Sequence, residues 1–304
     1  MANSARVNSG NMPRLLQGSI DMVLKHFDKT LKGMGNEIFE KMKTDKGFYE
    51  AVQLAGMGLA AIKGEGSQVS VDSVDQDWVY RWPVVCYSKA ARVTMEAIAD
   101  NQYEDVIPML GQNMAEGLAQ NKDVRMATVL NDGFSTGQNP DGVALFSASH
   151  TIQAGGTTSN LLSPAADMSE DAIEQMILLV DNLVLPSGLK SDYSSKDLVV
   201  PIQLRFEADR IVNSRYRVSS ADNDISAIYN QNVIKRVLPW KRLTDTDAFF
   251  ITTNAPKGLM LIERAGVTTD SFKEPTTLDV IITAYERFVA LYADFRGVVG
   301  SQGA

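Results

Sequence analysis

The spacing of hydrophobic positions divides the chain into helical and strand-like stretches. Before Arg14 the residues are polar and predict an arm with little structure of its own. The pattern then predicts an amphipathic helix over residues 16–31. This helix either packs on its own domain or docks on another chain, and the stripe alone leaves both open. Its apolar residues recur at helical spacing: Ile20, Val23, Leu24, Phe27 and Leu31.

Between residues 60 and 92 the hydrophobic period changes to two. Val69 and Val71 alternate with polar residues, and the polar run 72–77 predicts a turn, so the pattern indicates a long β-hairpin. Three aromatic residues on one strand face are too much apolar surface for a free hairpin, so they need the domain beneath or another chain. The sequence favours neither partner for these three: Trp78, Tyr80 and Trp82.

A long helix is predicted over about residues 103–131, with Pro108 in its first turn and Gly133 just after its end. At 1.5 Å per residue its length is about 40 Å, enough to cross a whole domain. Gly111 and Gly117 weaken it locally. Its apolar stripe consists of Ile107, Leu110, Met114, Leu118, Val129 and Leu130.

The second half of the chain mixes helices and strands. Residues 137–164 are rich in Gly, Ser, Thr, Asn and Pro and predict a long loop. A helix then begins at Asp167 or Ser169, with Asp167 and Glu170 resembling a capping box, and runs to about Leu183. A short helix is expected at 208–213. Strands are expected at 197–201, 233–239, 248–252, 258–262 and within 278–299, which makes the fold class α+β.

Composition narrows the classes of protein. The chain has 304 residues, enough for one large domain or two ordinary ones. Its net charge is −8 and no basic run occurs, unlike a dedicated nucleic-acid reader. The longest apolar runs are far shorter than the ~20 residues of a membrane helix, so no membrane association is expected. The single cysteine, Cys86, excludes an intrachain disulfide and is interpreted as a small buried hydrophobe.

The residue types that carry catalysis form no convincing constellation. The two histidines, His26 and His150, fall in a predicted helix and a loop, without zinc-ligand spacing. Ser149 precedes His150, but no acid partner or nucleophile elbow is identifiable. The polar run 222–224 is interpreted as a solvated turn rather than a metal site. We therefore expect no catalytic, cofactor-binding or metal-ligating residue, and no enzyme.

Several short runs, in this order, resemble the tailed-phage major capsid family with the Hong Kong 97-type fold, closest to Mu-like major head subunits. The similarity extends over about residues 46–300. The runs are MEAIADNQY at 95–103, LNDGF at 130–134, DGVALF at 141–146 followed by His150, NLL at 160–162, ADNDI at 221–225, LTDTDAFF at 243–250 and FRGVVG at 295–300.

The resemblance implies a division of the chain into four parts. An N-terminal arm would comprise residues 1–45, and a projecting hairpin, the E-loop, residues 58–93. The peripheral domain, with the long spine helix at about 103–131, would comprise 46–57, 94–164 and 246–304. The axial domain would comprise 165–245. The residues expected to contact neighbouring subunits are then Trp78, Tyr80 and Trp82 of the E-loop and Ile20, Val23 and Phe27 of the arm.

The function implied by the resemblance is that of a major capsid protein. Such subunits assemble as pentamers and hexamers into an icosahedral shell that encloses double-stranded DNA. Partners would include a portal and a separate scaffolding protein, with assembly in the host cytoplasm and final localisation in the virion. A covalent crosslink through Lys63 or Lys89 is not expected. The alternatives are an encapsulin-type compartment shell and a soluble hydrolase.

Overall fold

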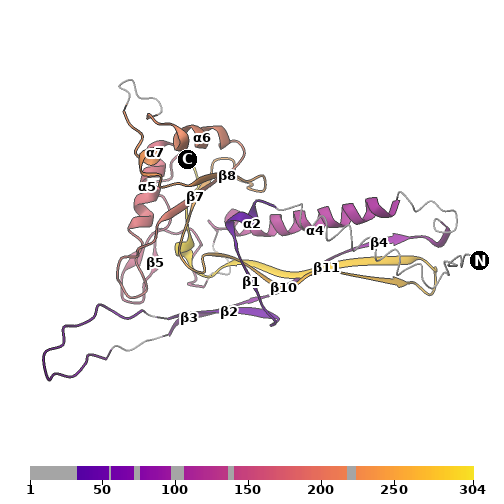
Figure 1. The fold of residues 1–304 in the computed structure, drawn as a ribbon, viewed down its shortest axis with the longest axis horizontal. Helices are drawn as coiled ribbons and strands as arrows, with labels where there is room; N and C mark the ends of the chain where they lie inside the picture. The colour runs from indigo at the N-terminus through magenta and orange to yellow at the C-terminus, as the bar shows by residue number, and fades with distance from the viewer. Residues whose placement is uncertain (1–32, 55, 72–75, 97–105, 136–139, 218–223) are drawn as a thin grey trace, which may run out of the picture.

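The protein is described from a computed structural model, which covers residues 33–54, 56–71, 76–96, 106–135, 140–217 and 224–304. The helix expected at 16–31 therefore lies outside the described residues. Figure 1 shows two bodies of different shape: an elongated one along the lower right and a more globular one at the upper left. A narrow ribbon projects beneath them.

The elongated body is built on a four-stranded sheet in the order β1-β10-β11-β4. Strand β1 (Glu40–Lys43) is parallel to β10 (Leu259–Lys273), and the other neighbours, β11 (Val280–Tyr292) and β4 (Val85–Val93), are antiparallel. One helix, α4 (Val106–Asn131), lies along the sheet and is the long helix that the sequence predicted (Figure 1).

Alternation along β11 explains why the helix covers one face of this sheet. The buried side chains Ile282 and Ala284 contact Met114 and Leu118 of α4, which belong to the predicted stripe. Since successive side chains on a strand point to opposite faces, the odd-numbered residues between 281 and 289 face the other way. Gly133 follows the helix end, where its N–H donates to the Leu130 carbonyl at 3.0 Å.

The globular body holds a second four-stranded sheet in the order β12-β9-β7-β8. Strands β7 and β8 are parallel, and β9 is antiparallel to β7 and to β12. The strands are β7 (Ser195–Val200), β8 (Arg236–Pro239), β9 (Phe249–Thr253) and β12 (Val298–Ser301), and the neighbouring helices are α5 (Glu170–Asp181), α6 (Arg205–Asn213) and α7 (Ala227–Gln231).

Sequence patterns placed most of these elements to within a few residues, with two corrections. Helix α5 is capped by Ser169, whose side chain accepts a hydrogen bond from the Ala172 N–H, so the capping box on Asp167 was wrong. The Asp167 carboxylate instead accepts from the Ala304 N–H. The strand expected at 258–262 is 15 residues long, because its outer part pairs with β11 and exposes alternate polar side chains.

Short elements complete the described chain. Helix α2 (Gly35–Ile38) precedes β1, and η1 (Phe295–Gly297) precedes β12. Two residue pairs, β5 (His150–Thr151) and β6 (Thr157–Thr158), form a small hairpin inside the predicted long loop.

One buried carboxylate joins the two bodies. Asp123 of α4 accepts hydrogen bonds from the Gly35 N–H at 3.0 Å and from the Trp240 indole at 3.1 Å. Trp240, which is fully buried, belongs to a core that also includes Phe146 and Phe250. The bodies therefore share one hydrophobic core rather than being separate domains joined by a linker.

Candidate assembly surface

The projecting ribbon consists of β2 (Phe48–Leu54) and β3 (Gln76–Pro83), which are antiparallel. Its inner face packs against β10 and β11 of the same chain, where Trp82 meets Met260 and Leu291. Trp82 is 7% exposed, and its ring lies edge-on to Tyr80 with 4.6 Å between centroids. Burial in the chain's own core, one of the two alternatives for the aromatic stripe, therefore holds for Trp82.

The remaining predicted contact residues differ in position. Trp78 and Tyr80 are partly buried at the edge of the same cluster, so each keeps surface that another chain could cover. Contact of the stripe with a neighbouring subunit stays a prediction, and Trp82 has the least surface left for it. The three arm residues, Ile20, Val23 and Phe27, lie outside the described residues.

The hairpin expected within residues 60–92 was wrong in its pairing. Val69 and Val71 are in no strand, and β3 pairs instead with β2, through Ala51 opposite Tyr80. Residues 56–71 form a long connection. Within it, the Ser67 N–H donates a backbone hydrogen bond to the Gly64 carbonyl. Alternation alone could not distinguish a strand from an extended segment without a partner.

The richest exposed apolar surface follows this connection and the outer face of the ribbon. Ile62 is 101% exposed, Val71 91% and Leu59 80%. Sequence reasoning missed most of these residues, because they are isolated among Gly, Ala and polar residues; only Val69 and Val71 showed a pattern. The full set is Val52, Leu54, Met57, Leu59, Ile62, Val69, Val71 and Val79.

A shallow cleft of about 370 Å³ lies between α4 and the strands β3, β4 and β11. Its apolar lining includes Val129 of α4, Leu145, and Val289 and Leu291 of β11. Arg125 at its edge stacks over the Tyr87 ring, with 5.3 Å to the centroid. The cleft therefore offers apolar walls with a charged rim, the usual composition of a protein contact.

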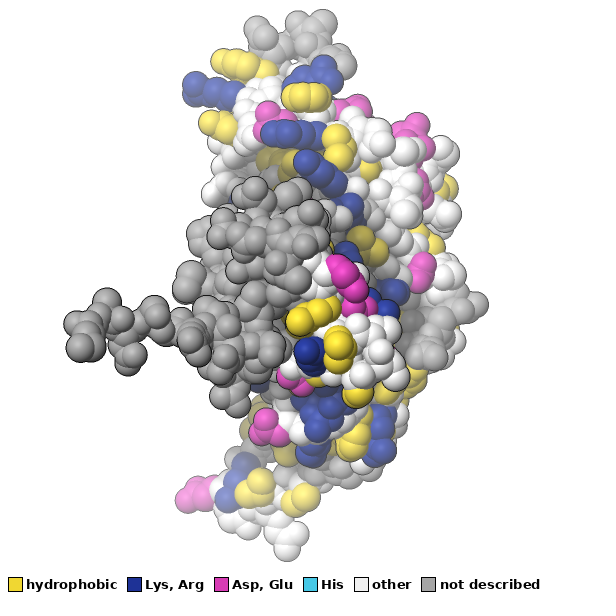
Figure 2. Space-filling view, turned by 90° about the vertical axis from the view of Figure 1, so that its right-hand side faces the viewer, with side chains coloured by type: hydrophobic (Ala, Val, Ile, Leu, Met, Phe, Trp, Pro, Cys, Tyr) yellow, Lys and Arg dark blue, Asp and Glu magenta, His cyan; other side chains and the backbone are white. Residues whose placement is uncertain are grey.

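Charge does not gather into one basic face on the end of the molecule shown in Figure 2. Lys and Arg side chains run from top to bottom of this end, interspersed with acidic and apolar ones. On the ribbon, Arg81 pairs with Glu50 at 3.2 Å and covers the Phe48 ring at 4.1 Å. This mixture fits protein contact better than a nucleic-acid grip, which needs clustered cations.

The sequence left His150 without an acid partner, and the structure supplies one. Its Nδ1 lies 2.5 Å from the Asp141 carboxylate, and its ring stacks on Phe295 with 3.7 Å between centroids. Nε2 faces the Leu145 carbonyl at 3.2 Å and the Asn160 side-chain oxygen at 3.0 Å. Since His150 is fully buried and both nitrogens face acceptors, it holds the loop together rather than serving as a general base.

Two further expectations concern reactive groups. Cys86 is exposed on β4, so its interpretation as a buried hydrophobe was wrong. It lies opposite Arg287 on the face that α4 leaves uncovered. In the described part of the chain, no group of three or more His, Cys, Asp or Glu residues could hold a metal ion. In the run 222–224, which the sequence interprets as a solvated turn, residues 222 and 223 lie outside the described residues.

A family model for phage capsid protein matches residues 80–301, which is well over half of the chain. The chain belongs to the phage capsid protein family. It is therefore a structural subunit of the virion that assembles into an oligomeric shell. The Mu-like subtype suggested by the sequence runs is not part of this finding, and the match does not favour a compartment shell.

Solved structures share the fold of this capsid protein at low sequence identity. A Mycobacterium phage Patience chain is 11% identical with a TM-score of 0.56, over 99% of this chain and 90% of that one. A Mycobacterium phage Adephagia chain is 12% identical with a TM-score of 0.55, over 90% of each. A virus-like particle of Pyrococcus furiosus is 11% identical with a TM-score of 0.54, over 93% and 98%.

Among curated proteins, the comparison finds no match to this capsid protein. None of its described helices combines the length and apolar character needed to cross a bilayer.

Proposed function

We propose that this chain is the major head protein of a tailed phage, forming pentamers and hexamers of an icosahedral shell around double-stranded DNA. The observation that carries the proposal is the exposed apolar surface of the ribbon and of residues 56–71. Large apolar side chains exposed in such number along one segment are unusual on a monomeric protein, so they mark a contact with another chain.

The Hong Kong 97-type division of the chain belongs to this proposal. The ribbon and residues 56–71 would be the E-loop, which would then begin near residue 48 rather than 58, because β2 is the partner of β3. Helix α4 would be the spine helix of the peripheral domain. The globular body would include the axial domain, at 165–245, and residues 1–45 would be the arm.

The energetics favour assembly through many weak contacts. Fully burying one Leu, Ile or Val side chain contributes roughly 1.5–3 kcal/mol. Several such residues on one loop offset the loss of translational freedom and the ordering of the loop, about 4–15 kcal/mol or more. The apolar cleft beside α4 offers a receiving surface on the neighbouring subunit.

Further partners follow from the same proposal. The net charge of −8 and the mixed surface of Figure 2 suit a wall that encloses DNA without sequence-specific contacts. A portal and a separate scaffolding protein would complete assembly, in the host cytoplasm. We propose a structural role without enzymatic activity, since the one buried histidine among described residues has both ring nitrogens engaged.

The test is electron microscopy of the purified chain, alone and with a candidate scaffold. Ile62→Asp and Val71→Asp are expected to reduce the yield of closed particles strongly while the melting temperature of the subunit stays unchanged, because both side chains are already in water. Ser70→Asp is the matched control, since it adds the same charge to the same loop. Normal particle yield from both apolar variants would refute the proposed role of this surface.

A further inference from the structure

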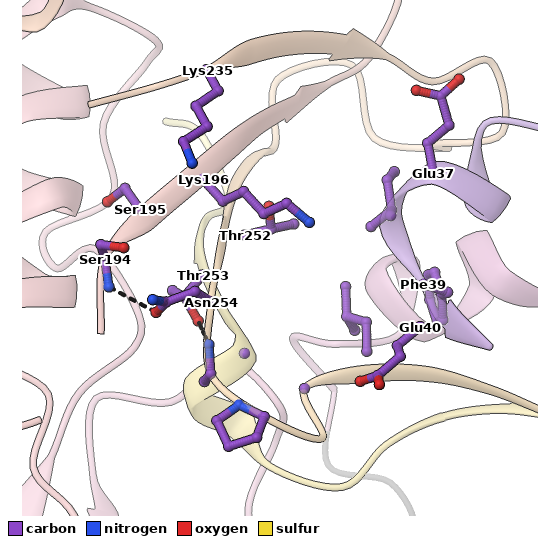
Figure 3. Close-up of a pocket in the computed structure, with 16 residues that line it drawn as sticks. Glu37, Phe39, Glu40, Ser194, Ser195, Lys196, Lys235, Thr252, Thr253 and Asn254 are labelled. Carbon is purple, nitrogen blue, oxygen red and sulfur yellow. Dashed lines mark hydrogen bonds between the residues drawn. The ribbon is translucent and has the colours of Figure 1, made fainter. Parts of the chain in front are cut away.

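A cleft of about 610 Å³ lies between the two bodies (Figure 3). One wall comes from β7, β9 and the residue that precedes β8, and includes Lys196, Lys235 and Thr252. The opposite wall comes from α2 and the start of β1, and includes Glu37 and Glu40. Its volume is within the range of small-molecule sites, about 300–1,000 Å³.

The basic wall contains two like charges placed directly opposite each other. The Lys235 N–H donates to the Lys196 carbonyl at 2.8 Å, one rung before the pair Asp197–Arg236 in the parallel ladder. Both lysine side chains therefore leave the same face of the sheet. Like charges at opposed positions on neighbouring strands are destabilising, so a negative charge beside the two ammonium groups would compensate for their repulsion.

No described carboxylate supplies that compensation. Arg236, on the next rung, pairs with Asp197 at 2.8 Å and with Glu37 at 3.1 Å, so Glu37 on the opposite wall already has a cation. Neither lysine amine forms an ion pair with a described residue. Figure 3 shows Lys196 reaching from its strand toward the middle of the cleft. The same wall includes the buried Ser195 hydroxyl, which has no hydrogen-bond partner among described residues.

We propose that this cleft binds a compact phosphate-bearing anion, held by Lys196 and Lys235. A phosphate presents several acceptor oxygens and about two negative charges, which match two ammonium groups on one wall. Glu40 on the opposite wall forms no ion pair with a described residue and would repel a long polyanion crossing the cleft, so the ligand is small and stays at the lysine wall. Free phosphate and a mononucleotide offer the same chemistry.

The test is calorimetric titration of the full chain with inorganic phosphate and, separately, with a deoxynucleoside monophosphate, at constant ionic strength. Lys196→Gln and Lys235→Gln are each expected to weaken binding about five- to tenfold, and the double variant to abolish it. Lys273→Gln, an exposed lysine at the far end of β10, is the matched control and is expected to bind normally. Equal binding of both probes identifies the phosphate group as the whole recognition element; tighter nucleotide binding identifies a nucleotide.

Both lysine variants are expected to fold, because both side chains are exposed. In the absence of phosphate, removing one of the two like charges is expected to raise the melting temperature slightly. Phosphate that binds no better than chloride would overturn the proposal, as would unchanged binding in the double variant. A short DNA duplex that binds through these lysines while phosphate does not would also overturn it, in favour of a DNA-backbone contact. None of these readouts depends on shell assembly, so failure here leaves the proposed function standing.

Discussion

Replacement of Lys122 by methionine is expected to destabilise the subunit far more than an ordinary surface change. The Lys122 ammonium lies between α4 and the sheet, 2.9 Å from the Glu286 carboxylate and 3.1 Å from that of Glu263. The Lys122 side chain is 13% exposed and that of Glu286 only 1%. Methionine keeps most of the side-chain volume but removes the ammonium group that pairs with the buried Glu286 carboxylate.

The magnitude follows from burial and distance. At about 3 Å and an effective dielectric constant of about 20, one such pair attracts by roughly 5 kcal/mol before desolvation is counted. Removing one partner of a buried pair costs about 3–5 kcal/mol, because the remaining charge stays buried. For a chain of this length that loss corresponds to a fall in melting temperature of about 5–8 °C.

Calorimetry and urea unfolding of the unassembled subunit would measure this change. The control is the double variant Lys122→Met with Glu286→Gln, which removes both charges and is expected to recover most of the lost stability. Glu263, whose side chain is 20% exposed, keeps access to water in either variant. A loss below about 1 kcal/mol in the single variant, or no recovery in the double variant, would refute the account of a buried ion pair.

Three further predictions concern stability. Burial lowers the pKa of Lys122, but Glu286 and Glu263 outweigh this effect and raise the pKa above 10.5. The stability that the Lys122 ion pairs contribute is therefore fully present below pH 10.5 and is lost as the pH rises through the folded-state pKa. Alkaline unfolding of the wild type compared with Lys122→Met measures this loss. Gly297→Ala is expected to lower the free energy of unfolding by about 3 kcal/mol, because the added Cβ would lie 2.3 Å from the Gly258 Cα. The control is Gly266→Ala, whose Cβ would meet no atom within 4 Å, and it is expected to change the free energy of unfolding by less than about 1 kcal/mol. Asn160→Asp removes an amide that donates to three buried carbonyls and is expected to lower the urea midpoint by an amount equivalent to about 3 kcal/mol; an unchanged midpoint would contradict the buried network.

Local periodicity was sufficient for much of the fold. The stripe through Met114 and Leu118 predicted α4, and Ser169 was among the two predicted starts of α5. The β-branched run near the C-terminus predicted strands, which the structure divides into β11 and β12 around a short 3-10 turn. These features depend on which residues of one segment share a face, and that information is present in the spacing itself.

Only the tertiary structure decided which segments meet. The pairing of β2 with β3, the exposure of Cys86 and the acid partner of His150 all depend on contacts that no local spacing encodes. Val69 and Val71 have the alternation of a strand, yet no other segment of the described chain lies beside them to form a ladder. Periodicity reports what a segment can bury, whereas the partner that buries it is chosen by the packing of the whole chain and, for this capsid subunit, by its neighbours in the shell.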